Sequence, residues 1–458
     1  MGIQQYTRES FDVSATPLMP TEKILIVLIV SFGFANAYTS PTDAYRATIE
    51  YSTKVNSSKY SYESKEEGLN EVYAKLYPQL EGSAGYARTD YTRNDMAGRR
   101  GDPRSQESTR ELGLTLSQVI YDPTLMTAID VEKSRIKYFY YGHELEKQKV
   151  ATEALDIYMT VLNIKNKIDL LKANLSYVEQ NQKMIEEKYS MSLVTKMDYL
   201  KVNVEAQKSR IDLLKEEKNY DAMFTKLLDV TKLESIVIPD INLDSITENF
   251  IKSILNTLEK NSSLDNNLEI LQARTAILLS ANEVDNAKSG HLPDLSMNAS
   301  YTKYISKDET TDYDNYGRAM VKLRIPIFQG GAVSSRIENK KLMKKSAEEE
   351  YRSIEDDVKV RLKENINLLK SEIATLTMYK DALVSGETYL ESVQLAYDKG
   401  LRSIVELFDA QNKLFEIKYD YIKSIHEMSN LFVKFIILTN NLEELSLIDN
   451  LVYKEERK

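Results

Sequence analysis

The sequence contains no cysteine. This excludes structural disulfides, thiolate metal sites and the attachment of a lipid to an N-terminal cysteine. Tryptophan is also absent, whereas tyrosine occurs 30 times. A tyrosine side chain has an apolar ring and a polar hydroxyl, and therefore suits interfaces between apolar and wet surroundings.

Glycine and proline are scarce, with 15 and 9 residues in a chain of 458. A chain of this length could form two or three ordinary domains, and it would need these residues to separate them. Their scarcity predicts long uninterrupted helices. From Thr124 to Lys188 there is no proline, and the one glycine is Gly142. We expect a helix on the order of 100 Å long there, followed by a second helix over residues 194–230.

Positive charge is not concentrated in any part of the sequence. The chain has 60 basic and 70 acidic residues and a formal net charge of −10. No basic cluster is dense enough to follow a phosphate backbone, so we expect no nucleic-acid partner.

Histidine occurs only at His143, His291 and His426, which are far apart in the sequence. No nucleophile, metal or phosphate motif surrounds them, and the glycine pair at 330–331 ends a predicted strand rather than forming a phosphate loop. We therefore predict that the protein is not an enzyme, needs no cofactor and has no structural metal site. The histidines are interpreted as surface or packing residues.

The N-terminal region has the pattern of a secretory signal. Lys23 precedes an apolar run over residues 24–34, which is too short to span a bilayer and ends in Ala35-Asn36-Ala37. We predict that residues 1–37 are a leader and signal peptide cleaved after Ala37. Because the region before the apolar run is unusually long, we expect translation to begin at Met19. The alternative is a buried core helix.

Residues 389–442 show a helix-packing pattern that begins after a turn at Gly400. From Ile404 to Ile436, mostly apolar residues recur with a period near 3.5. A weaker copy lies 208 residues upstream, where Tyr189 corresponds to Tyr397 and Asp198 to Glu406. One chain therefore contains two related halves.

Four segments alternate with a period of two, which is typical of strands. The aliphatic face of the fourth segment is backed by charged residues, as in a strand with lipid outside and water inside. An antiparallel sheet that covers a soluble core has the same alternation, and this pattern alone leaves both interpretations open. A polar turn region is expected at residues 94–107, and the strands are predicted at about 79–93, 109–121, 293–306 and 315–328.

Export and the strand count favour the membrane interpretation. Four strands cannot close a membrane barrel, because spanning barrels begin at about eight strands and tolerate no open edge. A homo-oligomer that pools its strands would solve this problem. We divide the chain after the leader into a first repeat (38–231), a connecting region (232–262), a second repeat (263–442) and a C-terminal tail (443–458).

Several short motifs resemble those of the TolC family of outer-membrane efflux and type I secretion channel proteins. The resemblance covers nearly the whole mature chain, and it depends on the order, spacing and duplication of the motifs rather than on any one of them. The motifs are Tyr77-Pro-Gln-Leu80, Gly290-His-Leu-Pro293, Ile325-Pro-Ile-Phe-Gln-Gly-Gly-Ala-Val333, Tyr397-x-x-Gly400-Leu401 and Glu406-Leu-Phe-Asp409-Ala-Gln411.

The resemblance implies a mainly α fold with β strands, a channel-tunnel built by a homotrimer. Each chain would give four strands to a twelve-stranded transmembrane barrel in the outer membrane, which continues as a long coiled α-helical barrel in the periplasm. Residues 232–262 and 443–458 would build an equatorial region at mid-height.

The resemblance also implies a pore constriction at Glu406 and Asp409, near the periplasmic tip. These acids are three residues apart and would share a helix face. Trimerisation would then place six carboxylates around the pore, where divalent or trivalent cations would block it. The alternative is that both acids simply complement the dipole of their helix N-terminus.

Two further sets of residues follow from the resemblance. Tyr397 and Arg402 would make gating links to Asp198, although Met197 stands where the family can carry a hydroxyl residue. Adaptor docking would use Gly400 and Leu401 in the second tip turn (397–402), and Ser192 and Leu193 in the first (189–194). Serine in a left-handed conformation costs roughly 1 kcal/mol relative to glycine, so we expect the first turn to differ in shape.

The implied function is an outer-membrane exit duct of a tripartite efflux pump or a type I secretion system. Its partners would be a periplasmic adaptor, an inner-membrane transporter of the RND, ABC or MFS type, and outer-membrane lipid. The alternative is a soluble periplasmic coiled-coil adaptor or scaffold. Neither the motifs nor the composition identifies the cargo, since a wide polar duct is not a fitted pocket.

Overall fold

The computed structural model describes residues 39–91, 105–241, 246–306 and 315–450. The predicted leader at residues 1–37, its proposed start at Met19, strand residues 92–93 and the end of the tail from residue 451 lie outside the described residues. The elements are α1 Pro41–Tyr51, α2 Thr53–Ala74, β1 Gln79–Tyr91, β2 Ser105–Tyr121, α3 Pro123–Ser190, α4 Lys196–Thr231, α5 Glu248–Lys260, α6 Leu268–Ser289, β3 Asp294–Ser306, β4 Tyr316–Arg324, α7 Ala332–Asp398, α8 Ile404–Thr439, the 3-10 helix η2 Leu442–Leu445 and α9 Ser446–Asp449.

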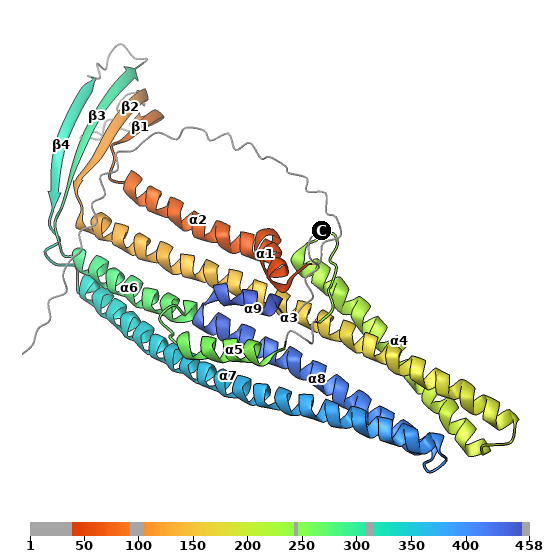
Figure 1. The fold of residues 1–458 in the computed structure, drawn as a ribbon. Coiled ribbons are helices and arrows are strands. Elements are labelled where there is room, and N and C mark those ends of the chain that lie inside the picture. The colour runs from red at the N-terminus through yellow and green to blue at the C-terminus, as the bar shows by residue number, and fades with distance from the viewer. Residues whose placement is uncertain (1–38, 92–104, 242–245, 307–314, 451–458) are drawn as a thin grey trace, which may run out of the picture. The chain divides into compact units, whose positions relative to one another are not determined.

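Two long helices, α3 and α7, connect the sheet to the tip turns (Figure 1). They contain 68 and 67 residues, so each is about 100 Å long. The part of α3 nearest the sheet packs against α2 and α6, and its other part packs against α4; α7 packs likewise against α6 and then α8. The helix predicted from Thr124 to Lys188 is therefore confirmed.

Two residues at the start of α3 fix where this long helix begins. Asp122 caps the N-terminus, because its carboxylate accepts hydrogen bonds from the backbone N–H groups of Thr124 and Leu125. Pro123 occupies the first helical position, where its missing N–H has no intrahelical partner to lose. Only Asp122 separates the end of β2 from the start of α3, so the chain passes from strand to helix without a longer loop.

The strands form one antiparallel sheet in the order β1-β2-β3-β4. Two predicted ends were wrong. Strand β2 begins at Ser105 rather than 109, because it pairs with β1 out to Tyr91. Strand β4 ends at Arg324 rather than 328, because Arg324 already pairs with Asp294, the first residue of β3, and β3 offers no further described strand residue beyond it.

The largest hydrophobic core lies where both repeats meet the connecting region. Buried side chains from α3 and α8 form its centre, with Tyr158 and Phe435 fully enclosed. Ile236, Ile254 and Ile448, from the connecting region and the C-terminal tail, are buried in the same core. Thr42 in α1 donates to the Asp449 carboxylate in α9, which ties the two ends of the described chain together.

None of the helices in the described residues is both long and apolar enough to cross a lipid bilayer.

Candidate functional site

The two tip turns have the same backbone structure, contrary to the expected difference in shape. Ser192 and Gly400 both adopt a left-handed conformation, with φ of 62° and 71°. In the first turn the N–H of Leu193 donates to the carbonyl of Lys188, and in the second the N–H of Leu401 donates to that of Ala396. These bonds close the ends of α3 and α7 in the same way, so serine accepts the strained conformation here.

The helix that follows each turn also starts in the same way. Thr195 and Ser403 are N-caps, and each forms a capping box with the acid three residues later, Asp198 or Glu406. The acid accepts a hydrogen bond from the N–H of the cap, and the cap's hydroxyl accepts one from the N–H of the acid. Both acids therefore have a structural task at a helix N-terminus.

Glu406 and Asp409 differ in how they are held. The Glu406 carboxylate also pairs with the Arg402 guanidinium. The backbone N–H of Ser403, the guanidinium of Arg402 and the hydroxyl of Ser403 keep the pKa of Glu406 below its ordinary value. Asp409 is exposed and has no hydrogen-bond or ion-pair partner among the described residues. The capping alternative thus accounts for Glu406 but leaves Asp409 without a structural task.

The predicted links to Asp198 are not made within the described part of the chain. Arg402, in the turn before α8, pairs with Glu406 four residues later, and the Asp198 carboxylate accepts a hydrogen bond from the Thr195 hydroxyl. The hydroxyl of Tyr397 instead lies 3.3 Å from Nζ of Lys188, which also sits over the tyrosine ring. Sequence reasoning missed Lys188, although a cation in the last turn of a helix is a favourable partner for nearby polar groups.

The four helices share a small hydrophobic cluster at the tip. Ile185 of α3, Val202 of α4 and Val393 of α7 pack with Leu407 and Phe408 of α8, all nearly completely buried. The two helical hairpins are therefore packed against each other in one chain. Beyond this cluster, Leu193 and Leu401 in the turns project with exposed fractions of 69% and 75%. The four predicted docking residues thus form two matching turns, each with one protruding leucine.

The sheet has one apolar and one polar face. Cross-strand partners lie on the same face, and the register aligns Leu80 with Leu116, Leu116 with Ala299, and Ala299 with Ala319. The opposite face carries Glu81, Glu111, Asp294, Arg318 and Lys322 in the described strands.

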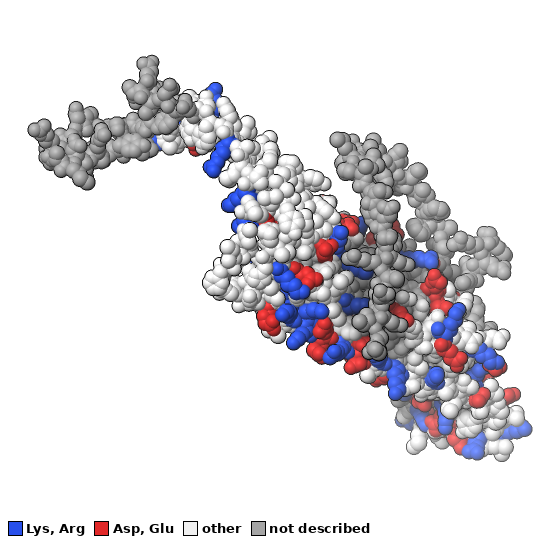
Figure 2. Space-filling view, turned by 90° about the vertical axis from the view of Figure 1, so that its left-hand side faces the viewer, with Lys and Arg blue, Asp and Glu red and all other residues white. Residues whose placement is uncertain are grey.

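Nothing in the described chain covers the apolar face. Leu80, Val321 and Leu323 are 72%, 61% and 60% exposed. The sheet region in Figure 2 is mostly white, whereas blue and red side chains are mixed over the helices. A large uncovered apolar face indicates contact with lipid or another protein.

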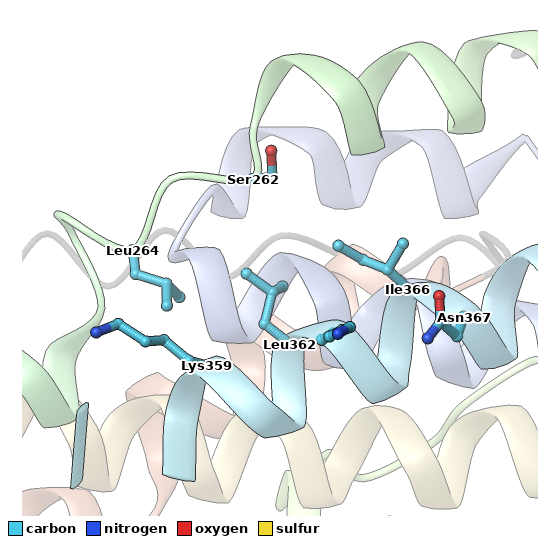
Figure 3. A pocket seen from close by; sticks show the side chains of 7 residues that line it. Ser262, Leu264, Lys359, Leu362, Ile366 and Asn367 are labelled. Carbon is cyan, nitrogen blue, oxygen red and sulfur yellow. The ribbon is translucent and has the colours of Figure 1, made fainter. Parts of the chain in front are cut away.

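The structure offers little for catalysis. Nδ1 of His143 lies 2.8 Å from the Ser58 hydroxyl, and His426 contacts Asn430. No group of three or more His, Cys, Asp or Glu side chains in the described residues could hold a metal ion. A hollow of about 330 Å³ beside α7 is lined by Leu264, Leu362 and Ile366 together with Lys359 and Lys363 (Figure 3). It lacks the convergent polar groups of a fitted site.

Comparisons with known proteins agree with this arrangement. A family model described as "Outer membrane efflux protein" matches residues 261–423. "Outer membrane protein TolC" of Escherichia coli (strain K12) is 24% identical over 407 residues, which cover 85% of this chain and 80% of that protein. The same protein of Salmonella enteritidis is 23% identical over 399 residues, with coverage of 85% and 79%.

Solved structures show the same fold. The outer membrane protein VceC from Vibrio cholerae superposes with a TM-score of 0.72 at 13% identity, and the match covers 87% of this chain and 95% of that one. The duplicated turns, the four-stranded sheet and these similarities point to one conclusion. The chain resembles the TolC family of outer-membrane efflux and type I secretion channel proteins in sequence, and it has the fold of solved outer-membrane channels.

Proposed function

We propose that the protein is the outer-membrane exit duct of a tripartite efflux pump or type I secretion system. It conducts cargo passively from an inner-membrane transporter and its adaptor to the outside. The proteins that it resembles are outer-membrane proteins, and in the proposed arrangement the sheet lies in that membrane and the helices lie in the periplasm. It acts as a duct and not as an enzyme.

The observation that carries this proposal is the four-stranded sheet. Its apolar face is uncovered, and within the described sheet β1 and β4 each leave one edge unpaired. Lipid would cover the face, and β4 of one chain would pair with β1 of the next, because a membrane barrel tolerates no open edge. Three chains would together supply twelve strands and close the barrel. A soluble periplasmic scaffold, the alternative from the sequence, has no use for such a face, and it does not agree with the relatives named above.

The helices support the same assembly. Exposed apolar residues follow α4 with steps of three, four, seven and three, at Met197, Leu200, Val204, Ile211 and Leu214. This is the seam of a helix that packs along a further helix. No described element of the same chain covers the seam, so a helix of the neighbouring chain is its partner in the proposed trimer. The connecting region and the C-terminal tail, which share the largest core, would form the equatorial region.

The tip would form the gate. Asp409 and Glu406 would constrict the pore, and the unmade links of Asp198 would form with Arg402 of a neighbouring chain. Tyr397 would assist through Lys188, which it already contacts. An adaptor would dock on the two matching turns through Gly400, Leu401, Ser192 and Leu193, and open the gate by contacting the open state better.

Single-channel conductance in a planar bilayer tests the duct and its constriction. We expect small, cation-selective steps that a trivalent cation blocks from the helical side. Glu406→Ala with Asp409→Ala should raise the conductance and weaken the block. The matched control, Glu350→Ala with Asp356→Ala, removes two exposed acids of α7 far from the tip and should leave the block unchanged.

The outcomes separate the two claims. Unchanged conductance and block in the tip variant would refute the constriction while leaving the duct intact. A folded protein that is extracted by carbonate and never conducts would refute the duct itself.

A further inference from the structure

The two open edges of the sheet carry opposite charges on its polar face. Strands β1 and β4 form these edges (Figure 1). On the polar face, β1 and its neighbour β2 carry acids, among them Glu81 and Glu111, and no lysine or arginine. On the same face, β4 carries the cations Arg318, Lys322 and Arg324 and no acid. One edge of the sheet is therefore complementary in charge to the other edge of a second copy.

Three of these charges lack an ion-pair partner among the described residues. Glu81 and Lys322 are exposed, and neither makes a hydrogen bond or an ion pair in this part of the chain. The guanidinium of Arg318 donates to a methionine sulfur 3.5 Å away, which is a weak acceptor. Arg324 differs from them, because it pairs with Asp294 of its own chain. The other cations of β4 are therefore available to a second copy.

Glu111 belongs to β2, but its side chain leans over the edge strand. It lies opposite Gly85 of β1, and a carboxylate oxygen is 2.7 Å from the point that a Cβ atom of Gly85 would occupy. Because glycine has no side chain, the acid covers β1 at this position. The edge of β1 thus presents two acids, at the levels of residues 81 and 85. The cations Arg318 and Lys322 have the same four-residue spacing on β4.

This equal spacing selects one register for the closing strands. When Lys322 of one chain lies opposite Glu81 of the next, antiparallel pairing brings the second cation to the second acid. Arg318 then faces the Glu111 carboxylate. A shift by two residues in either direction keeps the polar side chains on the polar face, but it places Met320 opposite one of the two acids. Only the first register matches both charges.

The geometry of a closed barrel agrees with this register. Within one chain, cross-strand partners connect Gln79 with Met320 through Ser117 and Asn298. In the register above, Met320 lies opposite Ser83 of the next chain, four residues beyond Gln79. Three chains then give a stagger of about twelve residues, which for twelve strands corresponds to a strand tilt of about 35°. Barrel strands typically tilt by roughly 35–45°.

We propose that the cations of β4 form ion pairs with the acids of the neighbouring chain and thereby select the register in which the barrel closes. Lys322 pairs with Glu81, and Arg318 pairs with Glu111. The inference rests on the proposed function, because the duct requires β4 to pair with β1 of a neighbour. Exposed ion pairs stabilise an assembly only weakly, but like charges at the same positions oppose it. The charges therefore discriminate between registers that the two faces alone do not distinguish.

Charge reversal tests the pairing through the fraction of trimer that survives mild heating in detergent. Glu81→Lys brings two cations together and should lower this fraction several-fold, and Lys322→Glu should do the same with two acids. Salt at about 1 M should reduce both defects, because it screens exposed charges. The combination Glu81→Lys with Lys322→Glu restores opposite charges and should recover most of the trimer. The matched control, Glu81→Lys with Arg318→Glu, has the same net charge without the restored pair and should recover none.

Disulfides on the apolar face test the register directly. The register sets Gly82 of one chain opposite Val321 of the next, so Gly82→Cys with Val321→Cys should cross-link efficiently on oxidation. Gly317→Cys is four residues away on β4, or about 13 Å, and should cross-link poorly with the same partner. Preferred cross-linking through Gly317→Cys, or recovery by Arg318→Glu rather than Lys322→Glu, would overturn the proposal.

Conductance of the same samples separates this inference from the function on which it rests. Trimers that conduct but show no recovery in the charge swap would refute only the ion pairs. An unchanged protein that forms no trimer and never conducts would refute the duct.

Discussion

At the scale of single residues, Ser192 and Gly400 form a matched pair in equivalent left-handed positions. A side chain costs about 1 kcal/mol or more in this conformation. A Cβ atom added at Gly400 would meet nothing within 4 Å. Substitutions at the two positions therefore test backbone conformation without a steric clash.

We predict that Ser192→Gly stabilises the first turn and that Gly400→Ser destabilises the second. Glycine loses more conformational entropy on folding than serine does. The net stabilisation of the folded turn by Ser192→Gly is therefore at most about 1 kcal/mol. Hydrogen exchange of the Leu193 amide should slow by up to roughly fivefold, and that of Leu401 should accelerate in the reciprocal variant. Changes in the same direction at both turns would contradict the prediction.

Glu406 makes the second tip helix sensitive to acid. Its pKa is lower in the folded protein than its ordinary value of 4.5. Its stabilising contribution is therefore fully present above pH 4.5 and is lost as the pH falls through the folded pKa. Hydrogen exchange in the first turn of α8 should accelerate in that range. In the Glu406→Gln variant, hydrogen exchange in this turn should already be faster at neutral pH and should not depend on pH in this range. An unaltered pH profile in the variant would show that other groups control the stability of the turn.

Among the elements, the tip cluster holds the two helical hairpins together. Leu407 is completely buried between them, so Leu407→Ala should cost about 2–5 kcal/mol of local stability. The control Leu401→Ala makes the same deletion at an exposed position and should change it by less than about 0.5 kcal/mol. Hydrogen exchange across the start of α8 measures both, and equal effects would mean that the hairpins separate without breaking this cluster.

The sequence predicted the long helices and the four strands because their periods persist over many residues. It could not set the ends of β2 and β4, because a strand end depends on how far the partner strand extends. Ser105, Gln106 and Glu107 are polar and lack alternation, yet they pair with β1. Residues 325–328 continue the apolar pattern, but they pair with no strand among the described residues.

The contacts at the tip also could not be predicted from sequence spacing. The predicted link between Arg402 and Asp198 came from the resemblance, but each residue has a nearer partner in its own chain, Glu406 and Thr195. Local capping competes with contacts between helices, and sequence spacing does not decide which one forms. The expected difference at Ser192 failed because the Leu193 hydrogen bond and the following cap together impose the left-handed turn.

For the whole molecule, the absence of cysteine makes cross-linking a clean test of the trimer. Strands β1 and β4 are separated by two strands, or roughly 14 Å, which is too far for a disulfide within one chain. Gly82→Cys should be combined in turn with Gly317→Cys, Ala319→Cys or Val321→Cys. We expect oxidation of at least one combination to give a ladder that ends at three chains. Each single-cysteine variant serves as the control and can form at most dimers. A ladder beyond three chains, or none with any combination, would contradict a closed trimer.

The open edges of the sheet also bear on how the protein is made. A hairpin such as α3 with α4 forms from neighbouring segments, whereas β2 must find β3 across nearly two hundred residues, and such distant pairings are slow. Until three chains meet, each carries bare strand edges and an apolar face, which readily aggregate. We therefore expect the helices to form first and the strands last, at the membrane. The rate of maturation should then depend steeply on how many newly made chains are present together.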